Sequence, residues 1–355
     1  MEEQRGSKEK HMRRKWMILT AAVVLVIVLV VGTVTLFNRI RTMSSVQRVE
    51  GDLYSADYYA DYKLDEVLEM GVSSVEELET ALSKKLFFGY PIETNENLFG
   101  CSAFAATTPE GKHIVGRNFD YAQAGALLLY TQPENGYRSY SMVNLAHLGV
   151  SEEQGTMPET LKGKLSILAA PYGSVDGLNE KGLSVSVLEL ETEPTSQDSG
   201  KTDITTTLAV RMLLDKASTT NEAIALLEKY DMHSSAGMPY HLLISDASGQ
   251  TVIVDWADQK MNVVDTHFAT NFQLSPGDDY GVGIGHDRYD KMKEILDATD
   301  STLTPEEAMN LLEEVSIEWN GEWDTEWSVV YHIDDFAVDI SNDMNYDKVH
   351  HFSKD

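Results

Sequence analysis

The chain begins with one long apolar segment, and the patterns of a folded domain follow it. Residues 16–37 contain no charged side chain, and a membrane-spanning helix needs about 20 apolar residues. A cleaved signal peptide has a shorter apolar core of about 7–15 residues, which ends at small side chains. The pattern therefore predicts a retained transmembrane signal anchor at residues 16–37, preceded by a basic tail at residues 1–15.

Charges on either side of this segment predict its orientation. The basic residues that precede it are Arg5, Lys8, Lys10, Arg13, Arg14 and Lys15. Only Arg39 and Arg41 follow it closely. Positive side chains are enriched on the cytoplasmic side of a membrane helix. We therefore expect a single-pass protein of the cell membrane, with a cytoplasmic N-terminus and an extracytoplasmic remainder.

The pattern changes twice between the apolar segment and residue 100. Residues 38–62 are polar and rich in tyrosine, without steady apolar periodicity, which predicts a linker or stalk. Two stretches of helical spacing come next, and Ser74 with Glu77 has the spacing of a capping box at the start of the second. We expect residues 63–100 to form either accessory helices or a removable pro-segment.

Strand patterns dominate the next hundred residues. Two hairpins are predicted first, and the second turns at Asn135-Gly136. Two more strands follow, in which Ser184 and Ser186 alternate with valines as in a half-buried strand. The first hundred residues after Cys101 are thus almost entirely β-structure.

Helices and strands then alternate to the end of the chain. Helical patterns cover residues 205–217, 220–230, 287–298 and 304–318, and strand patterns cover 240–256, 261–272, 326–334 and 336–341. Blocks of strands separated by helices are typical of antiparallel sheets layered with helices. We therefore expect one α+β domain over residues 101–355.

Composition excludes one class of partner. The chain has 57 acidic and 28 basic residues, a formal net charge of −29, and the basic N-terminal tail makes the remainder more acidic still. Such a surface repels nucleic-acid phosphates. We expect no nucleic-acid partner, and we interpret the acidity as a property of solubility.

The chain contains one cysteine, Cys101. Outside the cytoplasm a solitary cysteine is a free thiol or an intermolecular bridge, although a lone cysteine is also often a buried apolar side chain. A thiol nucleophile needs a base, but none of the ten histidines stands in a recognisable cysteine-protease context. If the Gly100–Cys101 bond is cut, the freed α-amine, with an ordinary pKa of about 7.7–8.0, supplies that base.

The hairpin that begins at Cys101 adds two charged groups. It returns through Arg117 and Asp120, whose side chains can reach the start of its first strand. An arginine favours the thiolate form, and an aspartate holds an ammonium group or orients an amine.

These motifs resemble a known family. "CSAF" and "GRNFDY", with Cys101, Arg117 and Asp120, are similar to the choloylglycine hydrolase and penicillin V acylase group of N-terminal-nucleophile (Ntn) hydrolases, which acid ceramidase also resembles. Downstream, "NEKGL" begins at Asn179, "HFATNF" ends one residue after Asn271, and "GHDRYDKM" contains Arg288. The resemblance covers roughly residues 98–335.

The resemblance implies a fold, a reaction and a set of roles. The fold would be a four-layer αββα sandwich, preceded here by the transmembrane helix, and the reaction would be hydrolysis of a linear, non-peptide amide. Cys101 would be the nucleophile and its α-amine the base, while Asn179 and Asn271 would donate to the oxyanion. The remaining three residues of the motifs, Arg117, Asp120 and Arg288, would tune and hold the nucleophile.

This chain differs from bile salt hydrolases in the hundred residues that precede the cysteine. In those enzymes, removal of the initiator methionine is enough to make the cysteine N-terminal. Here the exposure of Cys101 would need an internal cut, by attack of its sulfur on the Gly100 carbonyl. That maturation is closer to the acid ceramidase branch. The unhindered Gly100 is suited to it.

Several alternatives stay open at this point. An acyltransferase would pass the Cys101 thioester to an amine, and a surface binding protein would keep the fold without the chemistry. The expected partner is a small N-acyl amide, with a lipid-like acyl chain among the candidates, and the oligomeric state is open, including a homo-oligomer. We expect no cofactor and no metal, because His233, His241, His267 and His286 lack the spacing of metal ligands.

Overall fold

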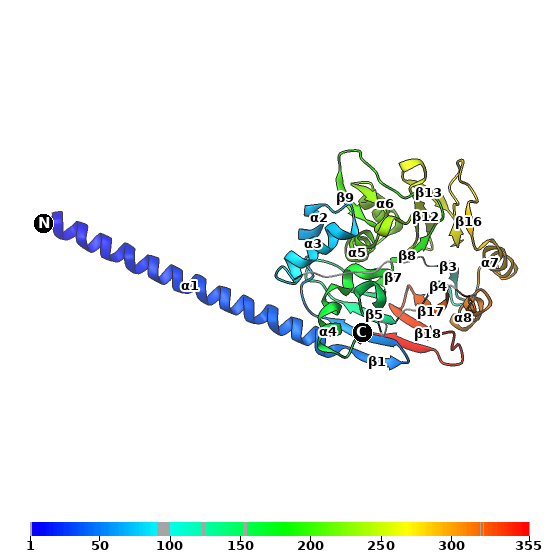
Figure 1. Ribbon diagram of the computed structural model, residues 1–355, viewed down its shortest axis with the longest axis horizontal. Helices are drawn as coiled ribbons and strands as arrows, with labels where there is room; N and C mark the ends of the chain where they lie inside the picture. Colours follow the sequence, from blue (N-terminus) through cyan, green and yellow to red (C-terminus); the bar gives the residue numbers. More distant parts are fainter. Residues whose placement is uncertain are drawn as a thin grey trace.

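Two β-sheets lie face to face between layers of helices, and one long helix projects from this body (Figure 1). The computed structural model describes residues 2–90, 100–122, 125–151, 155–319, 321 and 323–354, with side chains from residue 11 onward. Within these ranges the α+β prediction is confirmed.

The larger sheet has nine strands in the order β1-β2-β5-β6-β7-β8-β11-β12-β13. Neighbouring strands are antiparallel except for β2 and β5, which are parallel. The strands are β1 (Gln47–Glu50), β2 (Leu53–Tyr58), β5 (Ala126–Thr131), β6 (Ser139–Asn144), β7 (Ser174–Asn179), β8 (Ser184–Glu189), β11 (Tyr240–Ser245), β12 (Thr251–Asp255) and β13 (Asn262–Asp265).

The second sheet is antiparallel, with six strands in the order β14-β3-β4-β17-β18-β19. Its strands are β3 (Gly100–Thr107), β4 (His113–Tyr121), β14 (Phe268–Ala269), β17 (Asp324–His332), β18 (Ala337–Asn342) and β19 (His350–Ser353). Two small ladders complete the β-structure, and they pair β9 (Thr202–Thr205) with β10 (Tyr230–His233) and β15 (Asn271–Phe272) with β16 (Gly283–Ile284).

Helices cover the outer face of each sheet (Figure 1). Helix α5 packs on β7 and β8, whereas α7 and α8 pack on β3, β4, β14 and β17. The helices are α1 (Glu2–Ser45), α2 (Leu64–Met70), α3 (Val75–Leu86), α4 (Leu161–Ser166), α5 (Thr206–Lys216), α6 (Thr220–Leu227), α7 (His286–Ala298) and α8 (Pro305–Glu314). Short 3-10 turns lie at Leu145–Leu148, Ile167–Gly173, Ser235–Gly237 and Ala257–Gln259.

Strand β3 shows why the centre of the domain is buried on both sides. Cys101 and Ala103 belong to the core between the sheets, while Phe104 and Ala106 belong to the core under α7 and α8. Side chains alternate across a strand, so one strand serves both cores. The same layering corrects the half-buried strand predicted around Ser186, because all of β8 is buried between the second sheet and α5.

Residues 38–62 are not a stalk, contrary to the prediction. Helix α1 continues to Ser45, and β1 and β2 then form the edge of the larger sheet. In β2 the rings of Tyr54 and Tyr58 are buried, and the Tyr58 hydroxyl donates to the Leu168 carbonyl at 2.7 Å. Tyrosine counts as a polar residue in a sequence pattern, but its ring can be buried when its hydroxyl forms a hydrogen bond.

Helices α2 and α3 pack on the domain as accessory helices, near β9, α5 and the turn at Ile167–Gly173. The predicted cap at Ser74 is confirmed, because its side chain accepts from the Glu77 amide at 3.2 Å. The carboxylate of Glu77 binds Ser73 instead of Ser74. The reciprocal half of the capping box is therefore displaced by one residue.

Helix α1 contains one segment, His11–Ser45, that is long and apolar enough to cross a membrane, and its most apolar window makes no buried contact with the domain. Such a helix near an N-terminus fits either a membrane anchor or a signal sequence. Its last turns belong to the domain: Thr42 is buried, and its hydroxyl accepts from the amides of Tyr59 and Ala60 at 2.9 and 3.2 Å.

Candidate active site

Cys101 lies at the beginning of β3, between the two sheets, and has no exposed surface. In the β3–β4 hairpin, Ala103 pairs with Arg117 and Gly100 pairs with Asp120. Cys101 and Ala103 are two residues apart, so their side chains share a face. The register therefore brings the Arg117 side chain to the face that carries the thiol.

The Arg117 guanidinium connects the sulfur to the opposite sheet. Its Nη2 lies 3.2 Å from Cys101 Sγ and 2.8 Å from the Val187 carbonyl oxygen on β8. Its Nη1 donates to Asp176 on β7, which also accepts from the hydroxyl of Tyr331 on β17. All of these side chains are fully buried, so the carboxylate of Asp176 balances the buried cation where water cannot.

Asn271 holds the backbone nitrogen of the cysteine. Cys101 N donates to Asn271 Oδ1 at 2.7 Å, and Arg288 Nη2 donates to the same oxygen at 2.9 Å. The Asn271 amide nitrogen donates to the Glu189 carbonyl at 3.0 Å. Asn271 therefore fixes the residue at which the chain would be cut.

Asp120 lies against the bond that precedes Cys101. Its carboxylate accepts from Arg288 Nη1 at 2.7 Å and from the Thr325 hydroxyl at 2.6 Å. A methyl group built on Gly100 would stand 2.9 Å from Asp120 Oδ2. The glycine is thus required for this close approach of strand and carboxylate.

Burial controls the protonation of the thiol in the uncut chain. Burial raises the pKa of Cys101 to about 12, and the positive charge of Arg117 opposes this rise only in part. The neutral thiol lies 3.5 Å from the Val187 carbonyl, to which its S–H donates. Before any cut, the sulfur is therefore neutral at physiological pH.

Asn179 is the one predicted site residue that the structure does not bring to this site. The five that it brings together are Cys101, Arg117, Asp120, Asn271 and Arg288. The side-chain nitrogen of Asn179 donates to the carbonyls of Leu214 and Ala217, at 3.0 and 2.7 Å, at the end of α5. Its side-chain oxygen accepts from the amides of Lys181 and Leu183 in the β7–β8 turn. Asp176 and Asn179 are an odd number of residues apart on β7, so only Asp176 faces the second sheet. The prediction of Asn179 as an oxyanion donor is therefore wrong.

Sequence reasoning missed Asp176, Thr325 and Tyr331. An aspartate inside an otherwise apolar strand was a usable signal for Asp176, because a fully buried carboxylate needs a partner. Thr325 and Tyr331 gave no such signal, since their importance comes from packing of the closing strand β17 against β4 and β7.

Comparisons with known proteins identify the family and the fold of this chain. The model of the family "linear amide C-N hydrolases, choloylglycine hydrolase family" matches residues 101–280. A bile salt hydrolase/transferase of Clostridium perfringens is 26% identical over 176 residues, which cover 47% of this chain and 51% of that protein. A penicillin V acylase of Pectobacterium atrosepticum is 25% identical over 190 residues, which cover 49% of this chain and 48% of that protein. The chain thus spans about half the length of these curated relatives.

Two crystal structures of point variants of the conjugated bile acid hydrolase of Clostridium perfringens share the fold. Their TM-scores are 0.54 and 0.53, at 17% and 16% sequence identity. Each covers 71% of this chain and 92% of the known structure. The predicted Ntn-hydrolase sandwich is therefore confirmed, and the chain belongs to the choloylglycine hydrolase family of linear amide C–N hydrolases.

Proposed function

We propose that this protein hydrolyses the linear amide bond of a small N-acyl compound, with Cys101 as the nucleophile. The observation that carries the proposal is the 3.2 Å contact between Arg117 Nη2 and Cys101 Sγ, at the residue where the family match begins. Relatives are named for bile salts and penicillin V. Conjugated bile salts, penicillin V and N-acyl lipids are therefore the substrates to try first.

Maturation would begin at the Gly100–Cys101 bond. The Cys101 sulfur attacks the Gly100 carbonyl, the C–N bond breaks, and the thiol proton passes to the departing nitrogen. Water then hydrolyses the thioester, which leaves a carboxylate on Gly100 and restores the thiol. The close approach of Asp120 to Gly100 supports this step, because it places a carboxylate against the residue whose carbonyl is attacked.

Turnover would use both new groups of the terminal cysteine. The α-amine takes the thiol proton, the sulfur adds to the substrate carbonyl, and the proton returns to the leaving amine. Water then hydrolyses the acyl thioester and releases the acid. The nearby guanidinium of Arg117 favours the thiolate, and Asn271 supports the α-nitrogen through its hydrogen bond to Cys101 N. The carboxylate of Asp120 would hold the α-nitrogen when it carries a positive charge.

Oxyanion stabilisation by Asn271 stays a prediction. In the uncut chain its nitrogen donates one hydrogen to the Glu189 carbonyl, and the amide carries a second hydrogen that a substrate oxygen would accept. The hydrogen bond from Cys101 N to Asn271 Oδ1 supports a second role for the same side chain. That role is to orient the α-amine towards its own thiol, and Arg288 would hold Asn271 and Asp120 in place for it.

Helix α1 would be a membrane anchor rather than a removed leader. The contacts of Thr42 join its last turns to β2, and Arg41 stacks on the ring of Tyr59 at 3.6 Å from its centroid. A helix continuous with the domain holds the enzyme close to the bilayer. The excess of basic residues before the apolar segment supports an outward-facing domain.

The segment before the cut would stay bound to the catalytic chain. Strand β2 pairs with β5 along its whole length, and the Tyr62 hydroxyl donates to the buried Asp215 carboxylate at 2.6 Å. Near the C-terminus, His350 and Lys354 contact Glu50 and Asp57. The β2–β5 ladder, the buried hydrogen bond of Tyr62 and the ion pairs near the C-terminus all join the two sides of the proposed cut. Cleavage would therefore give a two-chain protein that remains on the membrane.

The decisive experiment measures the mass and N-terminal sequence of the mature chain, together with the amidase activity of Cys101→Ala. We expect a new N-terminus at Cys101 in the native protein, and an uncut, inactive chain in the variant. Full activity in Cys101→Ala would exclude the proposed nucleophile. A native protein with an unreactive thiol and no activity on any N-acyl amide would favour a binding protein instead.

Acyl transfer is the second candidate, since one relative is named a hydrolase/transferase. The same Cys101 thioester would then react with an amine in place of water. Adding increasing amounts of amine to a substrate assay separates the two reactions, because only a transferase converts the acyl group mainly to the new amide.

A further inference from the structure

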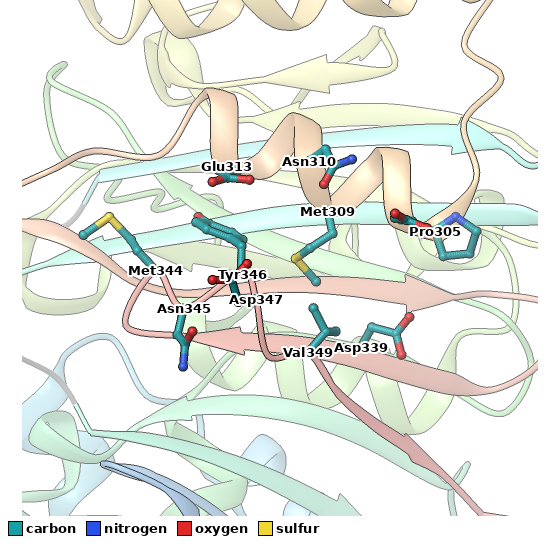
Figure 2. Close-up of a pocket in the computed structure, with 11 residues that line it drawn as sticks. Pro305, Met309, Asn310, Glu313, Asp339, Met344, Asn345, Tyr346, Asp347 and Val349 are labelled. Atoms are coloured by element: carbon teal, nitrogen blue, oxygen red, sulfur yellow. The ribbon is translucent and has the colours of Figure 1, made fainter.

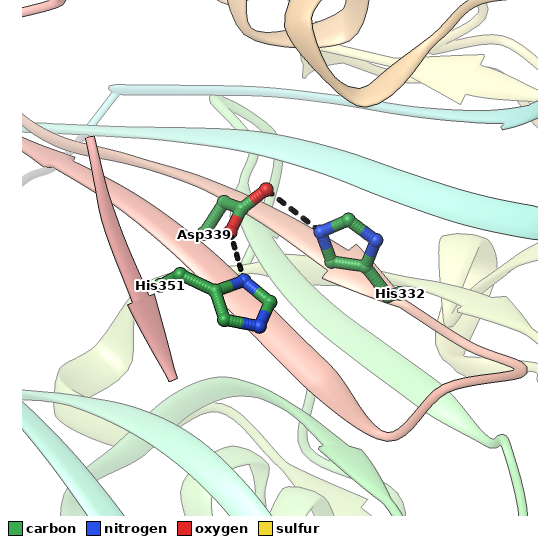
Figure 3. Close-up of side chains that lie close together, drawn as sticks. All are labelled: His332, Asp339 and His351. Carbon is green, nitrogen blue, oxygen red and sulfur yellow. Dashed lines mark hydrogen bonds and ion pairs between the residues drawn. The ribbon is translucent and has the colours of Figure 1, made fainter. Parts of the chain in front are cut away.

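A cluster of potential metal ligands lies on the six-stranded sheet, away from Cys101. His332, Asp339 and His351 come from the three neighbouring strands β17, β18 and β19 (Figure 3). His332 Nε2 is 2.8 Å from Asp339 Oδ2, and His351 Nδ1 is 2.6 Å from Asp339 Oδ1. The three donor atoms lie within 4.8 Å of one another.

The strand register explains why these side chains meet. Asp339 pairs directly with His351, and His332 pairs with Ala337, which lies two residues before Asp339. Residues paired across strands, or two apart along one strand, share a face of the sheet. All three side chains therefore point to the face that α8 partly covers.

The donor set is that of a d-block divalent cation. Two imidazoles and one carboxylate are ligands that Zn²⁺ takes at about 2.0–2.2 Å, with a fourth position left for water. Donors at those bond lengths stand roughly 3.3 Å apart in a tetrahedron, so the pair of His332 and Asp339 must open by roughly 0.5 Å and the pair of His351 and Asp339 by roughly 0.7 Å. His351 is 59% exposed, which leaves its ring free to adjust.

Each oxygen of the Asp339 carboxylate is hydrogen-bonded to one of the two imidazoles. A bound cation would replace the imidazole protons that make these bonds, since metal binding releases protons from its ligands.

A cavity of about 530 Å³ opens beside the cluster, between α8 and the segment that joins β18 to β19 (Figure 2). Asp339 belongs both to the cluster and to the wall of this cavity. Among the described lining residues, Glu306, Glu313 and Asp347 add negative charge, and none is basic. An acidic cavity concentrates cations, so it provides a path to the ligands.

We propose that His332, Asp339 and His351 bind a divalent transition-metal cation of the Zn²⁺ class. The cation would join β17, β18 and the outer strand β19 of the sheet, and so stabilise the C-terminal end of the domain. The role is structural and independent of the Cys101 chemistry. No metal pattern in the sequence indicates it, because the spacing of residues 332, 339 and 351 reflects strand register.

Isothermal titration of the untagged full-length chain in detergent, stripped with EDTA and titrated with Zn²⁺ alone, tests the proposal. We expect one saturable site per chain. His351→Gln, at an exposed position, should lower the affinity for Zn²⁺ by at least ~10–100-fold. That is the loss expected when only an outer-shell hydrogen-bond partner of a metal ligand is removed. Asp339→Asn should do the same, and bound Co²⁺ should give a visible ligand-field spectrum that His351→Gln removes.

Matched controls separate this site from other Zn²⁺ binding. His233 also pairs with an aspartate, Asp203, at 2.9 Å, but among the described residues this pair is not part of a group of three potential metal ligands. His233→Gln should therefore leave the affinity for Zn²⁺ unchanged. Cys101→Ala should also leave it unchanged, whether or not the chain is an amidase. Weak binding at many sites, or a single site that His351→Gln does not affect, would overturn the proposal.

Discussion

At the scale of single residues, Arg117 is the group on which the proposed reactivity of Cys101 depends. It contacts the sulfur, a carbonyl of the opposite sheet and the Asp176 carboxylate at once. Lysine keeps the charge, but its three N–H donors all lie on one nitrogen and do not reproduce the planar fork that contacts these three partners. The contacts therefore require the planar fork of arginine.

Arg117→Lys should lower kcat/KM for amide hydrolysis by about tenfold, because lysine keeps the charge but loses the hydrogen bond from Nη2 to the Cys101 sulfur, and a hydrogen bond to the charged form of a group lowers the pKa of an acid. The pH at which an alkylating reagent captures half of Cys101 should rise in parallel. The control is Arg138→Lys, since Arg138 pairs with Glu180 at the surface. Unchanged alkylation in Arg117→Lys would remove Arg117 from the proposed site.

Asn179 is the residue at which stability and catalysis can be told apart. Asn179→Ala leaves the carbonyls of Leu214 and Ala217 and two turn amides without their partner. We expect the free energy of unfolding to fall by ~1–3 kcal/mol, with turnover per folded molecule unchanged. An oxyanion donor would instead cost ~10²–10³ in kcat, and urea unfolding combined with active-site titration distinguishes the two.

At the scale of elements, the edge formed by β1 and β2 joins the long N-terminal helix α1 to the rest of the domain. The parallel pairing of β2 with β5 makes this segment part of the larger sheet, and α2 and α3 continue it over α5 and β9. The segment contributes to the core through Leu53 and Val67, neither of which has exposed surface. Removing it would therefore uncover apolar surface of the sheet.

The proposed cut should consequently release no catalytic chain from the membrane. Processed protein should separate into two pieces under denaturing electrophoresis and still elute as one particle in mild detergent. Tyr62→Phe should lower the urea concentration that separates the pieces, because its bond to Asp215 crosses the break. Tyr59→Phe is the control, since the hydroxyl of Tyr59 donates to Asp57, which lies two residues away on the same side of the break.

A protease site engineered into residues 91–99 gives the same test without self-cleavage. Release of the catalytic chain at neutral pH without denaturant would contradict the proposed retention. The same result would not contradict the proposal that Cys101 is the nucleophile.

At the scale of the whole molecule, two buried histidines make stability depend on pH. Burial lowers the pKa of both His147 and His241 to about 4, and Asp255 partly opposes the shift of His241. In the unfolded chain their pKa is near the ordinary ~6.5. Between pH ~6.5 and ~4 the unfolded state thus binds more protons, so these groups reduce stability as the pH falls.

The melting temperature should therefore decrease as the pH is lowered from ~6.5 towards ~4. The slope should be smaller in His241→Gln, whose amide can still donate to the Thr270 carbonyl that His241 Nε2 contacts at 2.8 Å. Replacement of the exposed His267 by Gln is the control. Equal slopes in the native chain and His241→Gln would show that this histidine does not drive the acid sensitivity.

Local patterns were sufficient wherever neighbours in sequence are also neighbours in space. The apolar segment before residue 38, the cap at Ser74 and the hairpin from Cys101 to Arg117 all depend on spacing along one or two adjacent elements. The hairpin register alone brings Arg117 to the thiol. Those features, with the family motifs, were enough to predict the fold and most members of the candidate site.

Tertiary packing decided the rest, because it sets which face of each strand meets which layer. It turned Asn179 towards α5 and Asp176 towards Arg117, and it made the tyrosine-rich segment after α1 an edge of the sheet. It also aligned His332 and His351 on either side of Asp339. The sequence by itself determined the family, the fold class and the hairpin that carries Cys101 and Arg117. Contacts between distant strands instead follow from register and layer order, which no local spacing contains.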